Sequence, residues 1–137
     1  MLPAAWRLAA GRVPALVPVP LTRARRRERG FNQAELLAQA LSRSTGWRVE
    51  GLLRRNRGGP SLARLGRRER EKVAERAYSI NPSFLEALDS HPEVLIVDDV
   101  ITTGATGVAC AEALVAAGAE CLGIVSFART NPLADGS

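Results

Sequence analysis

The stretch that most constrains the fold is residues 94–107, which read VLIVDDVITTGATG. Its first four residues, Val94 to Val97, form a continuous apolar run, which is typical of a parallel strand covered on both faces. Two carboxylates, Asp98 and Asp99, follow directly. In an open α/β sheet, ligands bind beyond the carboxyl ends of the strands. The run therefore predicts a strand that delivers two acids to a ligand-binding edge.

The residues after these acids predict a tight turn, a helix and a second strand. Residues 102–107 are small or hydroxylated, and the alanine-rich stretch 108–117 predicts a helix packed closely on a sheet. Gly118 is a typical helix stop. An apolar strand over 121–127 completes a βαβ unit. We therefore expect an α/β protein with a mainly parallel sheet flanked by helices.

The chemistry of this segment suits a sugar phosphate. Gly104 allows the backbone to bend and a ligand to approach, and the following helix points its free N–H groups and its dipole at the same place. These groups favour a phosphate, whereas the two acids accept hydrogen bonds from sugar hydroxyls. Because neighbouring strand residues point to opposite faces, the chain must turn at once after the strand if both acids are to reach one ligand.

Competing nucleotide-binding motifs do not fit. The sequence holds no GxxxxGK[ST] loop, and no GxGxxG follows a strand. A phosphoacceptor receiver domain would place its acidic pair near the start of the chain and a lysine late in it, but Lys72 is the only lysine.

The rest of the chain predicts alternating strands, helices and arginine-rich loops. Asn32 is expected to cap a helix, with Glu35 in a capping-box position and a stop at Gly46. The other expected elements are a strand at 16–19, a basic loop at 21–30, a strand at 47–53, a mobile loop at 54–66, short helices at 67–75 and 82–88 and a strand at 77–80.

The composition and net charge of the chain indicate which kinds of partner it binds. A length of 137 residues suits one domain, 1–137, and the net charge of +5 comes almost wholly from arginine, which favours a phosphorylated partner, either a small ester or nucleic acid. Cys110 and Cys121 read as small buried hydrophobes rather than zinc ligands. Neither a membrane-spanning run nor a signal peptide is evident, so we expect a cytoplasmic protein without membrane contact.

Two resemblances follow from these motifs. The stretch VLIVDDVITTGAT closely resembles the signature with which type I phosphoribosyltransferases bind phosphoribosyl pyrophosphate (PRPP). Residues 17–38, VPVPLTRARRRERGFNQAELLA, and the later LLRRNRGGPSLARLGRRERE resemble the competence-associated ComF family. Together these stretches cover most of residues 17–129.

The resemblance implies a set of roles. Asp98 and Asp99 would be the catalytic acids and would bind the ribose hydroxyls directly or through Mg²⁺. The residues expected to bind the 5-phosphate are Thr102, Thr103, Gly104, Ala105 and Thr106. Those expected to bind pyrophosphate are Leu21, Thr22 and Arg23. Those expected in a flexible loop that closes over the reaction are Arg55 and Arg57.

Several alternatives stay open at this point. The cysteine-rich zinc-binding segment common in ComF proteins has no counterpart here, and Thr102 stands where purine-salvage enzymes often carry a carboxylate. Three functions are still to be distinguished. The first is transfer of a phosphoribosyl group to an unidentified nitrogen acceptor. The second is non-catalytic binding of PRPP or a nucleotide in DNA uptake, and the third is direct nucleic-acid binding by the arginines. Competence proteins are possible partners, and the resemblance also implies a homodimer.

Overall fold

The computed structural model describes residues 1–21, 27–28, 30–56, 77–101 and 104–129. Its centre is a three-stranded parallel sheet in the order β1-β4-β5, formed by β1 (Ala15–Pro18), β4 (Glu93–Ile101) and β5 (Glu120–Arg129). The expected α/β class with a parallel sheet is confirmed.

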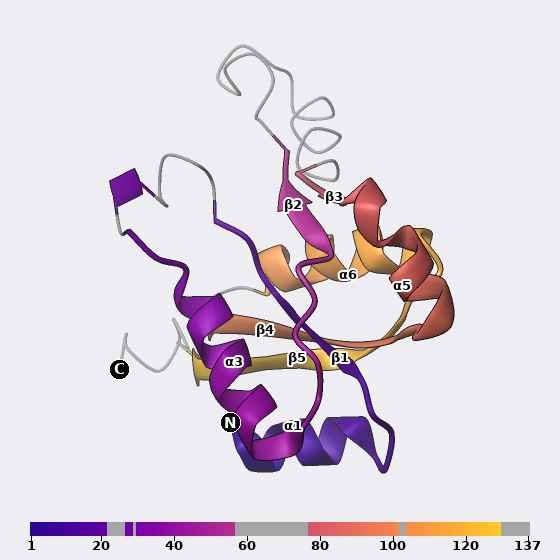
Figure 1. Cartoon of the computed structure of the whole chain (residues 1–137). Helices are drawn as coiled ribbons and strands as arrows, with labels where there is room; N and C mark the ends of the chain where they lie inside the picture. Colours follow the sequence, from indigo (N-terminus) through magenta and orange to yellow (C-terminus); the bar gives the residue numbers. More distant parts are fainter. Residues whose placement is uncertain (22–26, 29, 57–76, 102–103, 130–137) are drawn as a thin grey trace.

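Helices cover both faces of this sheet (Figure 1). On one face lie α1 (Leu2–Ala9) and α3 (Gln33–Thr45), and on the other lie α5 (Leu85–Ser90) and α6 (Ala105–Ala116). Side chains of β4 alternate between two buried clusters, with Ile96 on the α6 face and Val97 on the α3 face. This alternation explains the continuous apolar run that precedes the acids.

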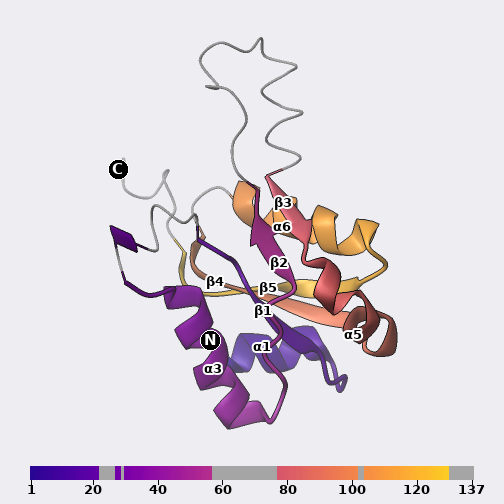
Figure 2. The same ribbon diagram turned by 45° about the horizontal axis from the view of Figure 1, so that its top comes forward.

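A second, two-stranded antiparallel sheet stands over the α6 face (Figure 2). It pairs β2 (Leu53–Arg55) with β3 (Tyr78–Ile80) and is followed by the short 3-10 helix η2 (Pro82–Phe84). Leu53 and Tyr78 pack in the same cluster as Ile96 of β4, so the antiparallel pair is anchored on the main sheet. The strand expected at 77–80 and the helical turn after Pro82 are confirmed.

The helix predicted after Asn32 is also confirmed, with both of its ends. The Asn32 side chain accepts a hydrogen bond from the Ala34 N–H, and Gly46 closes the helix in the left-handed conformation at φ 78°. Among the described residues, Glu35 does not complete the expected capping box, and it lines a cavity beside the helix.

Residues 47–53 do not form the expected strand. Only Val49 forms an isolated parallel bridge, to Leu16 of β1, and the true strand β2 begins at Leu53. The physical reason is that this stretch runs along the outer edge of β1 and pairs with it at one position only, after which it turns away from the sheet. As a consequence Arg54 and Arg55, which the sequence placed at the start of a loop, lie in a strand.

The first helix was not predicted as an element. In α1, Pro3 stands in the first turn, and the small residues Ala5 and Ala9 are fully buried against the sheet. Short alanine side chains allow the helix to lie close to β5. Because alanine is only weakly hydrophobic, the buried face of this helix is hard to recognise in the sequence. No helix among the described ranges is long and apolar enough to cross a membrane.

Candidate functional site

The two acids of the signature lie at the carboxyl end of the central strand. Contrary to expectation, β4 does not end before them but runs on to Ile101, and it pairs with β5 at Asp98–Ser126 and again at Val100–Ala128. Asp98 is only 9% exposed and is the one charged residue counted as buried among the residues that the structure describes. A buried carboxylate at a sheet edge needs a partner, which marks this position as a candidate site.

The structure brings the two acids together although no sharp turn separates them. The backbone N–H of Asp99 donates to a carboxylate oxygen of Asp98 over 2.8 Å. Burial first, and then a hydrogen bond with the Asp99 side chain and the charge of Asp99, raise the pKa of Asp98 to about 6, while the hydrogen bond from the Asp99 N–H opposes the shift. A site of this kind favours ligands that bring cations or hydroxyl donors, because these stabilise the charged form.

Gly104 and α6 supply the other half of the site. Gly104 has φ 82°, a conformation that costs other residues energy, and it stands at the N-cap without a side chain to cap the helix. The helix begins at Ala105, three residues earlier than expected, so Ala105 and Thr106 form its exposed first turn. The start of a helix of this length attracts anions.

A close contact fixes the start of α6 on the sheet. Gly107 is buried, and a Cβ atom built on it would stand 2.4 Å from Cδ1 of Ile124 in β5. The absence of a side chain therefore allows the first turn of the helix to approach the strand closely. This contact confirms the tight helix–sheet packing expected from the small residues.

The segment after β1 leads to the same edge. The Val19 N–H donates to the Val97 carbonyl over 2.9 Å, and the Asn32 side chain donates to the Val19 carbonyl over 3.1 Å. The chain beyond Val19 therefore starts next to the strand position that precedes Asp98. Leu21 is half-buried there.

The antiparallel pair β2–β3 contributes a cation on the Asp98 side of the sheet. The guanidinium carbon of Arg55 lies 4.9 Å from the centre of the Tyr78 ring, a cation–π contact. Electrostatic interactions link both Arg55 and Asp98 to Tyr78 and to the buried Cys110 of α6. Tyr78 was not predicted as a site residue. The sequence offers one indication of it, since the single tyrosine of the chain follows a long charged stretch.

Some of the expected site residues lie outside the described residues. These are Thr22, Arg23, Arg57, Thr102 and Thr103. Among the residues that are described, no group of three or more His, Cys, Asp and Glu could hold a metal ion. At the carboxyl end of β4 the described residues supply the pair of acids Asp98 and Asp99.

Comparison with known proteins gives a consistent set of relatives. Competence protein F of Haemophilus influenzae is 36% identical over 96 residues, which are 67% of this chain and 40% of that protein. Competence protein ComFC of Bacillus subtilis is 34% identical over 94 residues, 66% of this chain and 34% of its own length. DNA utilization protein YhgH of Escherichia coli is 35% identical over 117 residues, 84% of this chain and 49% of that protein.

The chain belongs to the ComF family. The resemblance seen in the sequence is thereby confirmed, and this ComF-family chain spans less than half the length of each of these three relatives. No protein-family model matches it. No solved structure matches it either.

Proposed function

We propose that this ComF-family chain binds a phosphorylated ribose, PRPP or a related nucleotide, at the Asp98 edge and serves DNA uptake or utilisation through that binding. The observation that carries the proposal is the placement of the buried Asp98, hydrogen-bonded to Asp99, close to the start of α6 at Gly104. Ribose hydroxyls would donate to Asp98 and Asp99, and the 5-phosphate would accept from the turn and the helix start. The link to DNA is supported by the name of the Escherichia coli relative, DNA utilization protein YhgH.

Magnesium fits the same residues. Mg²⁺ is commonly held by one or two carboxylates together with the phosphates of its ligand, so a pair of acids suffices. Asp98 and Asp99 would hold the ion, which would neutralise the charge of a bound pyrophosphate group. A bound cation would also favour the charged form of Asp98, whose burial otherwise disfavours it.

Two further segments support a pyrophosphate-bearing ligand. Leu21, with Thr22 and Arg23 after it, follows the strand that lies next to β4, as expected for a pyrophosphate loop. The strands β2 and β3 flank residues 57–76 in the sequence. The loop expected to close over the ligand, residues 54–66, starts in β2 and continues into this stretch, where Arg57 lies outside the described residues. An α/β fold of the type I phosphoribosyltransferase kind would account for both placements.

A second candidate function is transfer of the phosphoribosyl group to a nitrogen acceptor. The observation that favours it is Arg55, held over Tyr78 on the Asp98 side of the sheet. In such a reaction the bond from C1 of the ribose to pyrophosphate breaks, the acceptor nitrogen bonds to C1, and the nitrogen loses a proton. A fixed cation would stabilise the charge that develops on the departing pyrophosphate.

Thermal unfolding tests the binding function. A ligand that binds only the folded chain raises its melting temperature in a concentration-dependent way. We expect PRPP with Mg²⁺ to stabilise the chain more than ribose 5-phosphate does, and ribose without phosphate to have no effect. Equal stabilisation by all three would refute the site. Pyrophosphate release in the presence of a panel of nitrogen heterocycles would then separate the transfer function from binding alone.

A further inference from the structure

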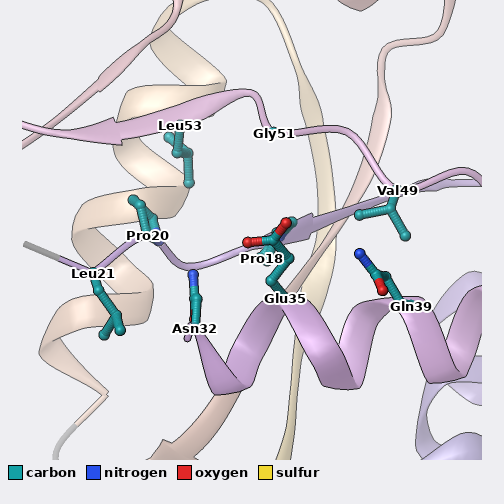
Figure 3. A pocket seen from close by; sticks show the side chains of 9 residues that line it. All are labelled: Pro18, Pro20, Leu21, Asn32, Glu35, Gln39, Val49, Gly51 and Leu53. Atoms are coloured by element: carbon teal, nitrogen blue, oxygen red, sulfur yellow. The ribbon is translucent and has the colours of Figure 1, made fainter. Parts of the chain in front are cut away.

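A cavity of about 440 Å³ lies between α3, the end of β1 and the stretch that leads into β2 (Figure 3). Its lining residues are Pro18, Pro20, Leu21, Asn32, Glu35, Gln39, Val49, Gly51 and Leu53. The volume is within the range of small-molecule sites, about 300–1,000 Å³. The cavity is therefore large enough for a nucleoside.

The cavity is distinct from the acid pair. Val17 and Val19 of the β1 segment pack in the cluster on the α6 face, the face toward which Asp98 also points. Pro18 and Pro20 alternate with them and line the cavity beside α3. A ligand in the cavity would thus lie across β1 from Asp98, next to the segment that begins the expected pyrophosphate loop.

Few of the residues that line the cavity carry polar side chains. Pro18 and Pro20 have no backbone N–H to offer. The Asn32 side chain is already engaged, since its amide nitrogen donates to Val19 and its oxygen accepts from Ala34. The two remaining polar side chains of the lining are Glu35 and Gln39.

These two side chains are placed to act on one ligand. They are four residues apart in α3, so they lie on the same face of the helix, one turn apart. Figure 3 shows both rising from α3 toward the chain that carries Val49 and Gly51. Glu35 is half-buried and Gln39 is exposed, which places the carboxylate deeper than the amide.

A carboxylate in this position disfavours phosphate and favours a ligand that presents N–H donors. Carboxylates accept from exocyclic amino groups of bases, and glutamine pairs with the edge of adenine through two hydrogen bonds. The prolines, Val49 and Leu53 offer apolar surface for a flat ring. We infer that this cavity binds an adenine base, with Glu35 and Gln39 as the recognising residues.

Adenosine and thymidine are the probes that test the inference, by calorimetric titration of the whole chain. Thymidine has no exocyclic amino group, so we expect it to bind at least about tenfold more weakly than adenosine. Glu35→Gln should weaken adenosine binding by about tenfold, and Gln39→Ala should weaken it in the same direction. Glu112→Gln, which removes an exposed carboxylate from α6, is the matched control and should leave adenosine binding unchanged.

The variants also separate this site from the proposed sugar-phosphate site. Glu35→Gln should keep PRPP binding, which shows that it is folded, while Asp98→Asn should keep adenosine binding. A loss confined to adenosine would assign the cavity to free nucleosides, and an equal loss for an octamer of deoxyadenosine would assign it to bases of single-stranded DNA. Adenosine binding that is absent in the wild type, or unchanged in Glu35→Gln, would overturn the inference.

Discussion

The backbone N–H of Asp99 donates a 2.8 Å hydrogen bond to the carboxylate of Asp98, the residue directly before it in β4. Neighbouring residues of a regular strand point to opposite faces, yet the two carboxyl groups also share a side-chain hydrogen bond, which brings both acids to one place. The Asp98 carboxylate stays buried at the carboxyl edge of the sheet, and its burial disfavours the charged form. The stability and the binding of the chain should therefore respond oppositely to changes at Asp98.

Asp98→Asn should stabilise the chain at pH 7.5 without Mg²⁺ or ligand. Because the pKa of Asp98 is about 6 in the folded chain and 3.8 ordinarily, folding favours its protonated form, and stability falls as pH rises from about 4 to 6. The asparagine keeps an acceptor for the Asp99 N–H but carries no charge. We expect a gain on the order of 1–2 kcal/mol above pH 6, allowing for screening by solvent.

Urea unfolding at pH 4 and pH 7.5 measures this gain. The exposed Asp89 of α5 is the matched control, because Asp89→Asn keeps Asp98 and should therefore keep the fall in stability that the wild type shows between the two pH values. An Asp98→Asn chain that is less stable than the wild type at both pH values would contradict the assignment.

Gly104→Ala should reduce both stability and sugar-phosphate binding. A side chain at φ 82° costs about 1–2 kcal/mol, and relief of this strain would shift the first turn of α6. Gly51→Ala is the control, because a Cβ atom there meets nothing within 4 Å and no positive φ is imposed. Chemical denaturation together with a PRPP titration checks both effects, and equal behaviour of the two variants would rule out a special role for Gly104.

Asn32 should contribute to stability through two separable hydrogen bonds. Asn32→Ala removes both the helix cap and the donor to the Val19 carbonyl, with an expected loss of about 1–2 kcal/mol. Asn32→Asp keeps the capping oxygen and loses only the donor, so its loss should be smaller. Thermal unfolding of the two variants measures the two contributions. If Asn32→Asp is as unstable as Asn32→Ala, the whole loss of stability comes from the hydrogen bond to the Val19 carbonyl and none from the helix cap.

Arg55→Ala should weaken PRPP binding more than ribose 5-phosphate binding, because only PRPP carries the pyrophosphate that the cation would meet. We expect a loss of about tenfold for PRPP, which corresponds to about 1.4 kcal/mol. Arg54→Ala is the matched control, since the neighbouring Arg54 instead donates to Ser79 of β3. Equal losses for both sugar phosphates in Arg55→Ala would point to a change in the antiparallel pair rather than to a pyrophosphate contact.

The sequence predicted those parts of the fold whose signals are local. The apolar run before Asp98, the cap at Asn32 and the glycine at Gly46 each determine their element through short-range chemistry, and all three are found as expected. The end of β4 and the start of α6 were misplaced because strand pairing with β5 continues past the acids. That pairing depends on residues about 28 positions later in the chain, which a local pattern does not reveal.

The sequence predicted which residues form the acidic end of the candidate site, but not which residues from other segments surround it. Asp98, Asp99 and Gly104 form a contiguous motif and could be recognised without a structure. Arg55 over Tyr78 and the cavity beside Glu35 join segments that are far apart in the sequence. Glu35 in particular has a plausible local role in a capping box, and only the tertiary placement of Val49 and Pro18 gives it another.

Calorimetric titration of PRPP in the presence of Mg²⁺, comparing the wild-type chain with Asp98→Asn/Asp99→Asn, tests the central claim most directly. The account predicts saturable binding by the wild type, no measurable binding by the double variant, and a double variant that is folded and at least as stable as the wild type. Absence of PRPP binding by the folded wild-type chain, or equal binding by the double variant, would contradict it.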